Sequence, residues 1–388
     1  MVISRKRFRK RRKSDKIFYQ LAKGSTIFCI AILVIILSSI IIKSFGAFNS
    51  SYVVIETKKY LNDNKDLDID HVLLNCFENP ELASFVKTII SKREIGKINN
   101  LKTTRKIYLK LTSKYDQYIR NNIKTHINEN DITYINELAK KDAISVNLNF
   151  DFFINTDSRE PEKAGALVGI IGSLMTVLIS MIIAVPIGII TAIYLEEIAK
   201  RSWIHELIEV NIANLASIPS IIYGILGLSI FIIIFNLPRS SSLIAGLTLG
   251  LMVLPIIVVS TRQALRTIPN NIRDAAMGLG ASKLQTIIHH LIPLSLPGIM
   301  TGIILSIARV MGEAAPLLML GMVAYMANIP ESVFEPATVL PIQIYLWATS
   351  IESGYIEKTF AAILMLLIIS IFLNFIAFWV RKKYERIW

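Results

Sequence analysis

Charged residues and cysteines are scarce in this sequence of 388 residues. Charged residues make up 18 % of the chain, whereas soluble domains carry roughly 25 %. Hydrophobic residues make up 53 %, and the mean hydropathy is +0.52. This balance excludes an ordinary soluble enzyme and a disordered chain. It indicates an integral membrane protein.

The signatures of several catalytic and metal sites are absent from the sequence. The chain has no G-x-x-x-x-G-K-[ST] loop for nucleotide phosphates, no H-E-x-x-H, no C-x-x-C and no G-x-S-x-G. Cys29 lies in an apolar stretch and Cys76 in a polar one, so we expect neither a disulfide framework nor a metal site. We therefore predict that the chain is not an enzyme and holds no metal or cofactor of its own.

Six apolar stretches are long enough to cross the roughly 30 Å hydrocarbon core of a bilayer. They are Gly24–Ile42, Gly165–Leu195, Ile212–Phe235, Leu243–Thr261, Leu294–Ala327 and Phe360–Val380. The first has the basic flank of a signal peptide, but its 19 residues exceed the usual apolar region of about 7–15 residues, which favours a retained helix. The expected fold is an all-α membrane protein with six transmembrane helices.

The net charge of +13 is concentrated at the two ends of the chain. Residues 1–23 contribute +9 and residues 381–388 contribute +3. Because Lys and Arg resist translocation, we expect both tails in the cytoplasm and do not interpret them as nucleic-acid-binding arms. The predicted division is a basic tail at 1–23, a first helix at 24–45, an external segment at 46–163, a core of five helices at 164–381 and a second basic tail at 382–388.

The large external segment is compatible with a small mixed domain. It contains a helix-like pattern at Leu101–Ile119. The carboxylates in Asn62–Asp70 invite interpretation as a calcium loop, but the turn glycine and the terminal glutamate of such loops are missing. A solvated acidic turn is the preferred interpretation.

The loop at about 264–293, between the fourth and fifth apolar stretches, carries cap and turn residues at regular spacing. Asn270 or Asn271 is expected to cap a short helix, and Gly280 to end it in a left-handed turn. A second short helix at Lys283–Leu291 is expected to end at Pro293. The pattern predicts a docking knob, with an ordinary loop as the alternative. The positions that carry it are Asp274, Ala275, Ala276, Gly280 and Pro293.

The sequence of this loop resembles the EAA loop of ABC-importer permeases, with Asp274 where the family usually has Glu. Further motifs narrow the resemblance to the PstA-type permease of phosphate ABC importers, over roughly residues 165–380. These motifs are Ala192-Ile193-Tyr194-Leu195-Glu196-Glu197, Asn214-Leu215-Ala216-Ser217-Ile218-Pro219-Ser220-Ile221-Ile222-Tyr223-Gly224, Leu247-Thr248-Leu249 and Arg309-Val310-Met311-Gly312-Glu313-Ala314-Ala315-Pro316-Leu317.

The resemblance implies the type I permease fold and the import of inorganic phosphate by alternating access. It implies four kinds of partner: a sister permease of the PstC type, two ATPase subunits of the PstB type that bind the ATP, an external phosphate-binding protein, and membrane lipid. It implies no nucleic acid. The EAA-like positions are implied to couple to the ATPase subunits, in the cytoplasmic membrane.

Arg309 and Glu313 are the two ionisable residues in an otherwise apolar stretch. Charges in such a place usually face the bundle interior or a water-filled cavity, and positions i and i+4 pair on one helix face. One interpretation is an ion pair that fixes the packing. The other, which the resemblance also implies, places both residues in the substrate pathway, where the planar guanidinium binds phosphate oxygens and Glu313 holds it when no anion is present.

Two other functions remain open. A permease for phosphonate, sulfate or molybdate could carry the same EAA loop. A membrane anchor could leave the work to the external domain, but passive helices give no reason to retain Arg309 and Glu313.

Overall fold

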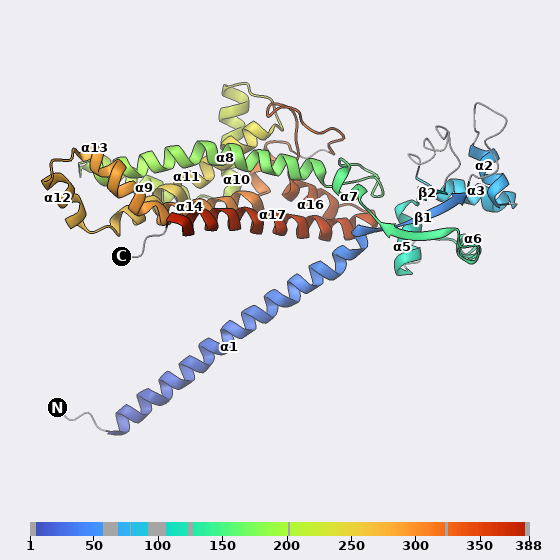
Figure 1. Ribbon diagram of the computed structural model, residues 1–388, viewed down its shortest axis with the longest axis horizontal. Helices are drawn as coiled ribbons and strands as arrows, with labels where there is room; N and C mark the ends of the chain where they lie inside the picture. The colour runs from blue at the N-terminus through green and yellow to red at the C-terminus, as the bar shows by residue number, and fades with distance from the viewer. Residues whose placement is uncertain are drawn as a thin grey trace.

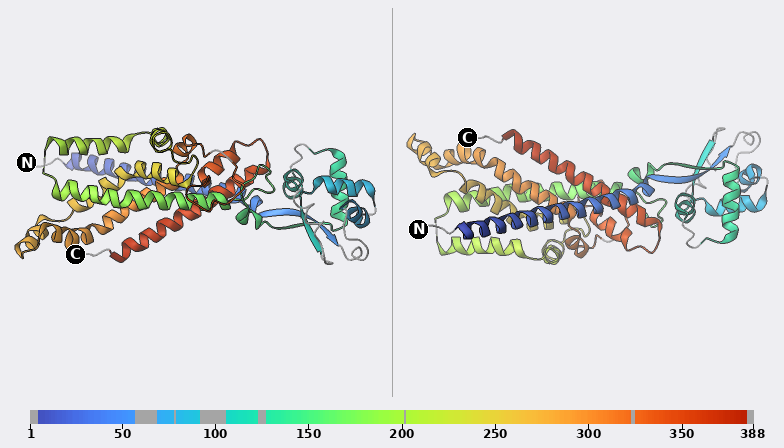
Figure 2. Two further views of the ribbon diagram at one scale, coloured as in Figure 1. Left: turned by 90° about the horizontal axis from the view of Figure 1, so that it is seen from above. Right: turned by 90° about the horizontal axis from the view of Figure 1, so that it is seen from below.

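The computed structural model describes residues 5–56, 69–77, 79–91, 106–122, 127–200, 202–322 and 325–384. These residues form an elongated molecule, with a bundle of long helices and a small α/β domain beyond one end of it (Figures 1 and 2). The predicted acidic turn at Asn62–Asp70 lies outside the described residues, except for its last two positions.

Five helices among the described residues are long and apolar enough to cross a membrane, and a bent pair of helices supplies a sixth candidate. The predicted all-α membrane fold is therefore confirmed. The start of the first long helix and the end of the last lie toward the same end of the molecule (Figure 1). The five long helices are α1 (Arg5–Ser44), α8 (Leu167–Ile193), α11 (Ser242–Arg266), α14 (Ile292–Gly312) and α17 (Gly354–Tyr384).

The predicted span Ile212–Phe235 is not one straight helix. It is divided between α9 (Trp203–Ser217) and α10 (Ser220–Gly227), which continues as a π-helical segment to Ile234, and the two parts meet at an angle of 104°. The break falls at Ile218, whose ψ of 134° is the extended conformation that a residue before proline prefers. Pro219 also lacks the N–H that a continuous helix would need.

The predicted apolar stretch Leu294–Ala327 is interrupted as well. Helix α14 ends at Gly312, and a short helix, α15 (Ala315–Met319), follows. In a continuous helix the ring of Pro316 would clash with the carbonyl of Gly312, which explains the interruption. A further helix, α16 (Leu340–Ala348), precedes α17.

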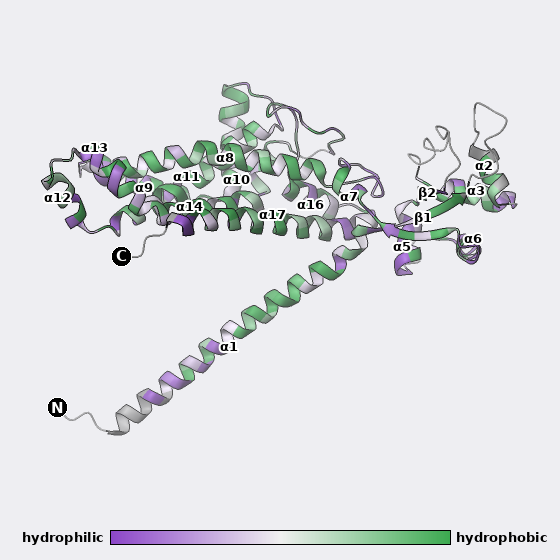
Figure 3. Cartoon of the chain, viewed as in Figure 1, coloured by the Kyte–Doolittle hydropathy of each residue, from purple (hydrophilic) through white to green (hydrophobic). Residues whose placement is uncertain are grey.

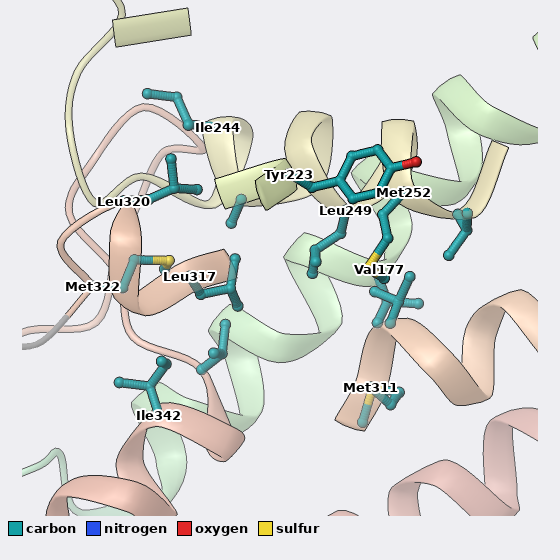
Figure 4. Close-up of a cluster of buried hydrophobic side chains, with 14 of the residues drawn as sticks. Val177, Tyr223, Ile244, Leu249, Met252, Met311, Leu317, Leu320, Met322 and Ile342 are labelled. Atoms are coloured by element: carbon teal, nitrogen blue, oxygen red, sulfur yellow. The ribbon is translucent and has the colours of Figure 1, made fainter. Parts of the chain in front are cut away.

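The core of the bundle forms where α8 and α11 pack together and where α10, α14, α15 and α16 meet them (Figure 4). Gly246 of α11 lies so close to α8 that a methyl group at its Cβ position would come within 2.6 Å of Ile179. Lipid tails are as apolar as these side chains, so the association of the helices depends on van der Waals contact and on small residues that permit close approach.

The segment predicted to be external folds as an α/β domain with a core of its own. We call it the external domain, and the end of the bundle beside it the outer end. Its sheet is antiparallel with the order β2-β1-β3, and Val53 of β1 and Leu109 of β2 are buried beneath the helices. The helix-like pattern predicted at Leu101–Ile119 is wrong for residues 106–110, which form a strand paired with β1. The elements are β1 (Asn49–Glu56), α2 (Ile69–Phe77), α3 (Pro80–Ile89), β2 (Lys106–Lys110), α5 (Ser113–Asn121), α6 (Glu129–Lys140) and β3 (Ile144–Leu148).

Arg120 of α5 connects this domain to the start of α17 through an ion pair. Its Nη2 atom lies 2.7 Å from Asp116 Oδ2 and 2.7 Å from Glu357 Oε2. Burial lowers the pKa of Arg120, but the bonds to the two carboxylates outweigh it and raise the pKa above its usual value. The guanidinium is therefore a permanent, satisfied cation at the outer junction.

Helix α1 leaves the outer end of the bundle and diverges from it (Figure 1). The apolar part of α1 is green, the colour of hydrophobic residues, in Figure 3. Large side chains there, such as Phe28 and Ile35, are exposed. This surface has the chemistry of a helix that contacts lipid tails or another apolar helix.

Candidate substrate pathway and docking surface

Arg309 lies in the last turn of α14, and Glu313 is the residue at which that helix ends. The Arg309 Nε atom is 3.6 Å from Glu313 Oε1, which is too long for a hydrogen bond. Arg309 makes no hydrogen bond to any other part of the described chain, and its side chain is 33 % exposed, against 21 % for Glu313. The guanidinium therefore keeps its N–H donors available.

Glu313 also lines a small cavity with Ser173 and Thr176 of α8. The Thr176 hydroxyl is buried and has no hydrogen-bond partner among the described residues. A buried polar group without a partner is costly, so the wall of this cavity favours water or a polar ligand over an apolar one.

The two interrupted helices meet beside this site. Gly224 of α10 lies against α15, where a methyl group at its Cβ position would come within 2.6 Å of the Pro316 carbonyl oxygen. The Tyr223 hydroxyl donates to the Leu215 carbonyl at 2.7 Å and so satisfies an acceptor in the last turn of α9. Broken helices at membrane depth are tolerated where they are buried or line a cavity, and they are typical of transport sites.

The predicted knob, at about 264–293, contains a short helix, α12 (Asn270–Gly278), and lies at the opposite end of the bundle from the external domain (Figure 1). Gly280 has a φ of +90°, so the predicted left-handed turn is confirmed. Asp274 and Ala275 are exposed and Ala276 is buried. The structure therefore places Asp274, Ala275 and Ala276 together on one short helix, with Gly280 in the turn that follows it.

Two details of the predicted knob are wrong. Asn270 does not cap α12, since Pro269 precedes the helix without a side-chain hydrogen bond and Asn270 is the first helical residue. The second helix, α13 (Lys283–Thr286), does not end at Pro293, but continues through the π-helical turn η4 (Ile287–Leu291) into α14. Pro293 lies in the first turn of α14, where proline is tolerated.

Large apolar side chains project from the knob. Leu279 is 91 % exposed, and Met277, Leu284 and Ile288 are exposed as well. Apolar groups gathered on a part of the chain rimmed by polar residues mark a protein contact surface. The knob therefore has the character of a docking surface.

An ion-pair network that the sequence does not predict lies at the same end of the bundle. Arg262 of α11 is buried, with its Nε 3.2 Å from Glu196 Oε2 and its Nη2 3.0 Å from Glu209 Oε1. Arg266 Nε lies 2.8 Å from Glu196 Oε1. These partners are 53 to 70 residues apart in sequence, so the only available signal was the pair of glutamates at the end of the second apolar stretch.

A buried carboxyl group lies at the outer end of the bundle. Asp157 Oδ1 accepts a hydrogen bond from Trp347 Nε1 at 3.0 Å, whereas Oδ2 has no partner among the described residues. Burial raises the pKa of Asp157 to about 6, against the lowering effect of the bonds from Trp347 and Ser158. The carboxyl is therefore partly protonated near neutral pH.

A family model described as the binding-protein-dependent transport system inner membrane component matches residues 184–386. The chain belongs to this family. The match includes α12, Arg309 and Glu313, and it begins after the external domain.

The chain is 34 % identical over 224 residues to the phosphate transport system permease protein PstA 1 of Mycobacterium tuberculosis (strain CDC 1551 / Oshkosh), which covers 57 % of this chain and 72 % of that protein. It is 33 % identical over 203 residues to the phosphate transport system permease protein PstA of Haemophilus influenzae (strain ATCC 51907 / DSM 11121 / KW20 / Rd), covering 52 % and 71 %. The resemblance to PstA-type permeases is thereby confirmed. A solved inward-facing structure of the MetNI methionine ABC transporter aligns at 16 % identity, with a TM-score of 0.43, over 55 % of this chain and 92 % of that one.

Proposed function

We propose that this chain is the permease subunit of an ATP-driven importer that carries inorganic phosphate across the cytoplasmic membrane by alternating access. The observation that carries the proposal is Arg309, a cation inside the helix bundle whose guanidinium makes no hydrogen bond within the described chain. The names of the relatives support phosphate as the substrate.

The chemistry of the proposed step follows from the geometry of this pair. A guanidinium offers two parallel N–H groups, which match two oxygens of a tetrahedral oxyanion. Glu313, at 3.6 Å, attracts the same cation and weakens the net attraction for an anion. Phosphate is therefore held while the pathway is closed on both sides and released when the helices reorient.

The proposed partners each have a place on the molecule. Two ATPase subunits, which bind the ATP, dock on the knob through Asp274, Ala275 and the exposed apolar residues around Leu279. Closure of these subunits moves α12 and, through the helices that follow it, α14 and Arg309. A sister permease completes the pathway within the lipid bilayer, and an external phosphate-binding protein delivers phosphate to the outer end. Both tails lie in the cytoplasm.

Uptake of radiolabelled phosphate in a strain that lacks this chain tests the proposal. Complementation with the chain, together with its partner subunits, is expected to restore ATP-dependent uptake. Absence of restored uptake from a chain that reaches the membrane and assembles would refute the proposal.

Two alternatives are separated by the same assay. An excess of sulfate, molybdate or phosphonate abolishes phosphate uptake if the pathway serves another oxyanion, and leaves it unchanged if phosphate is the substrate. If the chain is a membrane anchor for its external domain, deletion of the knob leaves the activity of that domain intact. The proposal predicts instead that the deletion uncouples ATP hydrolysis from transport.

A further inference from the structure

Arg273 of α12 uses its whole guanidinium for contacts inside the chain. Its Nη2 atom lies 2.6 Å from Glu197 Oε1, and its Nε atom lies 3.2 Å from both carboxylate oxygens of Glu197. Its Nη1 donates to the Ile268 carbonyl at 2.8 Å, and its Nη2 also donates to the Leu265 carbonyl at 3.0 Å. Few donors remain for an external partner.

These contacts join three elements at one point. Glu197 lies in the π-helical turn η2 (Tyr194–Ile198) that ends α8, and the two carbonyl groups belong to the last turn of α11 and the residues just after it. A cation at a helix C-terminus satisfies carbonyls that have no partner within the helix and interacts favourably with its dipole. Arg273 therefore binds the start of α12 to the ends of both helices.

The pair is shielded from water, which makes it a stiff contact. The Arg273 side chain is 17 % exposed and that of Glu197 is 9 % exposed. Exposed ion pairs contribute little and are screened by salt, but removing one partner of a buried pair leaves an uncompensated charge. Several directed hydrogen bonds also fix the angle of α12, which apolar packing of Ile272 alone would not do.

Glu196, the neighbour of Glu197, joins the helices to which the Arg273–Glu197 pair attaches α12. Glu196 contacts Arg262 and Arg266, and Arg262 also reaches Glu209, so α8, α9 and α11 are held together at this end. Among the described residues, Arg273–Glu197 is the one ion pair between α12 and these helices. The two adjacent glutamates on the π-helical turn thus bind different arginines, Glu196 those of α11 and Glu197 that of α12. Turns of π-helix occur frequently at functional sites.

We propose that Arg273 and Glu197 are positioning residues that transmit the displacement of α12 to α8 and α11. The inference rests on the proposed function, in which the ATPase subunits push on α12, and extends it to a pair that lies behind the docking surface. When the pair is broken, movement of the ATPase subunits rotates α12 about its apolar contacts. Little of that displacement is then transmitted to α8 and α11.

The test uses the complete transporter in proteoliposomes, with phosphate uptake and ATP hydrolysis measured together. Arg273→Gln and Glu197→Gln are each expected to raise the ATP consumed per phosphate by roughly five- to tenfold, the low end of the typical coupling between two sites. The KM for phosphate is expected to stay unchanged, because Arg309 is untouched. Lys382→Gln, which removes one exposed charge at the same end of the bundle, is the matched control and is expected to behave as the unaltered protein.

The double variant Arg273→Gln/Glu197→Gln and a conservative variant complete the design. The double variant is expected to be no worse than either single one, since both remove the same contact, and Glu197→Asp is expected to recover part of the coupling. Independent, additive losses, or a normal ATP-to-phosphate ratio in both single variants, would overturn the proposal. If Arg273→Gln does not co-purify with the ATPase subunits, Glu197→Gln, which retains size and hydrogen-bonding capacity, decides the outcome.

Failure of this inference differs from failure of the proposed function. If the unaltered transporter carries no phosphate, the proposed function is wrong. If it carries phosphate and the variants remain fully coupled, only the role of the pair is wrong.

Discussion

Arg309, inside the bundle, and the arginines at the end of the bundle beside α12 differ in how far their hydrogen-bonding capacity is used. Arg262 and Arg273 reach carboxylates at 2.6–3.2 Å, and Arg273 also reaches two carbonyl groups. Arg309 has one carboxylate at 3.6 Å and no hydrogen bond within the described chain. A satisfied arginine holds helices together, whereas the described chain leaves the N–H donors of Arg309 unused, as the proposed binding of phosphate requires.

The same difference distinguishes the outer end of the molecule from its middle. Arg120 is satisfied by Asp116 and Glu357 and joins the external domain to α17. Three satisfied arginines therefore lie at junctions between elements, and Arg309 lies where α14 breaks off inside the bundle. Replacing each of these four arginines in turn by glutamine tests whether Arg309 serves transport and the other three serve stability.

The largest effect is expected from Arg309→Gln. Two charge-assisted hydrogen bonds to phosphate, each of about 1.5 kcal/mol, are lost, so phosphate uptake is expected to fall roughly a hundredfold. The thermal unfolding midpoint and assembly with the ATPase subunits are expected to remain unchanged. Arg239→Gln, at an exposed turn, is the control; uptake that survives in the Arg309 variant would remove that residue from the pathway.

The opposite pattern is expected from Arg262→Gln. Glu196 and Glu209 lose a buried partner, and breaking a buried pair costs about 3 kcal/mol. The unfolding midpoint is expected to drop by several degrees, while the KM for phosphate in the folded fraction is unchanged. If the Arg262→Gln variant instead has a raised KM for phosphate and normal stability, the distinction between structural Arg262 and substrate-binding Arg309 is wrong.

The comparison of satisfied and unsatisfied charged groups extends to a buried acid, Asp157. Its Oδ2 atom is buried without a hydrogen-bond partner among the described residues, and its pKa is raised to about 6 in the folded protein. The folded state therefore binds more protons than the unfolded one, and stability is expected to decrease as the pH rises from about 4 to about 6, by up to about 3 kcal/mol.

The Asp157→Asn variant is expected to lose this pH dependence, because the amide can still accept the bond from Trp347 and carries no charge. Unfolding midpoints measured across this pH range provide the check. A variant with the same pH slope as the unaltered protein would assign the dependence to other groups.

The smallest effect on transport is expected from Arg120→Gln. The loss of the contacts to Asp116 and Glu357 loosens the external domain, so limited proteolysis at the junction is expected to become faster. Uptake is expected to change less than twofold, because the family match begins beyond this domain. A large loss of uptake would instead place the external domain within the transport cycle.

The sequence predicted the apolar stretches and the EAA-like loop because these depend on local composition and spacing. Hydropathy alone did not show the breaks at Ile218 and after Gly312, since it sums over residues and is blind to the direction of the backbone. Pro219 and Pro316 were the available signals. The strand at residues 106–110 was missed because Lys-Ile-Tyr-Leu-Lys also fits a helical pattern over a longer window.

The partners of the buried arginines could not be predicted from spacing at all. Arg273 and Glu197 are 76 residues apart, and their meeting depends on how α8, α11 and α12 come together in space. Arg309 and Glu313 were found because charges in an apolar stretch are visible in the sequence. Only the structure shows that this pair is loose.

The most direct test of an available Arg309 is the accessibility of its neighbour. In a Cys29→Ser/Cys76→Ser background, the Glu313→Cys variant leaves Arg309 in place and introduces a single reactive thiol. We expect a water-soluble thiol reagent to modify this position in the assembled transporter, and phosphate, but not sulfate, to slow the reaction. A thiol that does not react, or that reacts at the same rate with and without phosphate, would contradict the account.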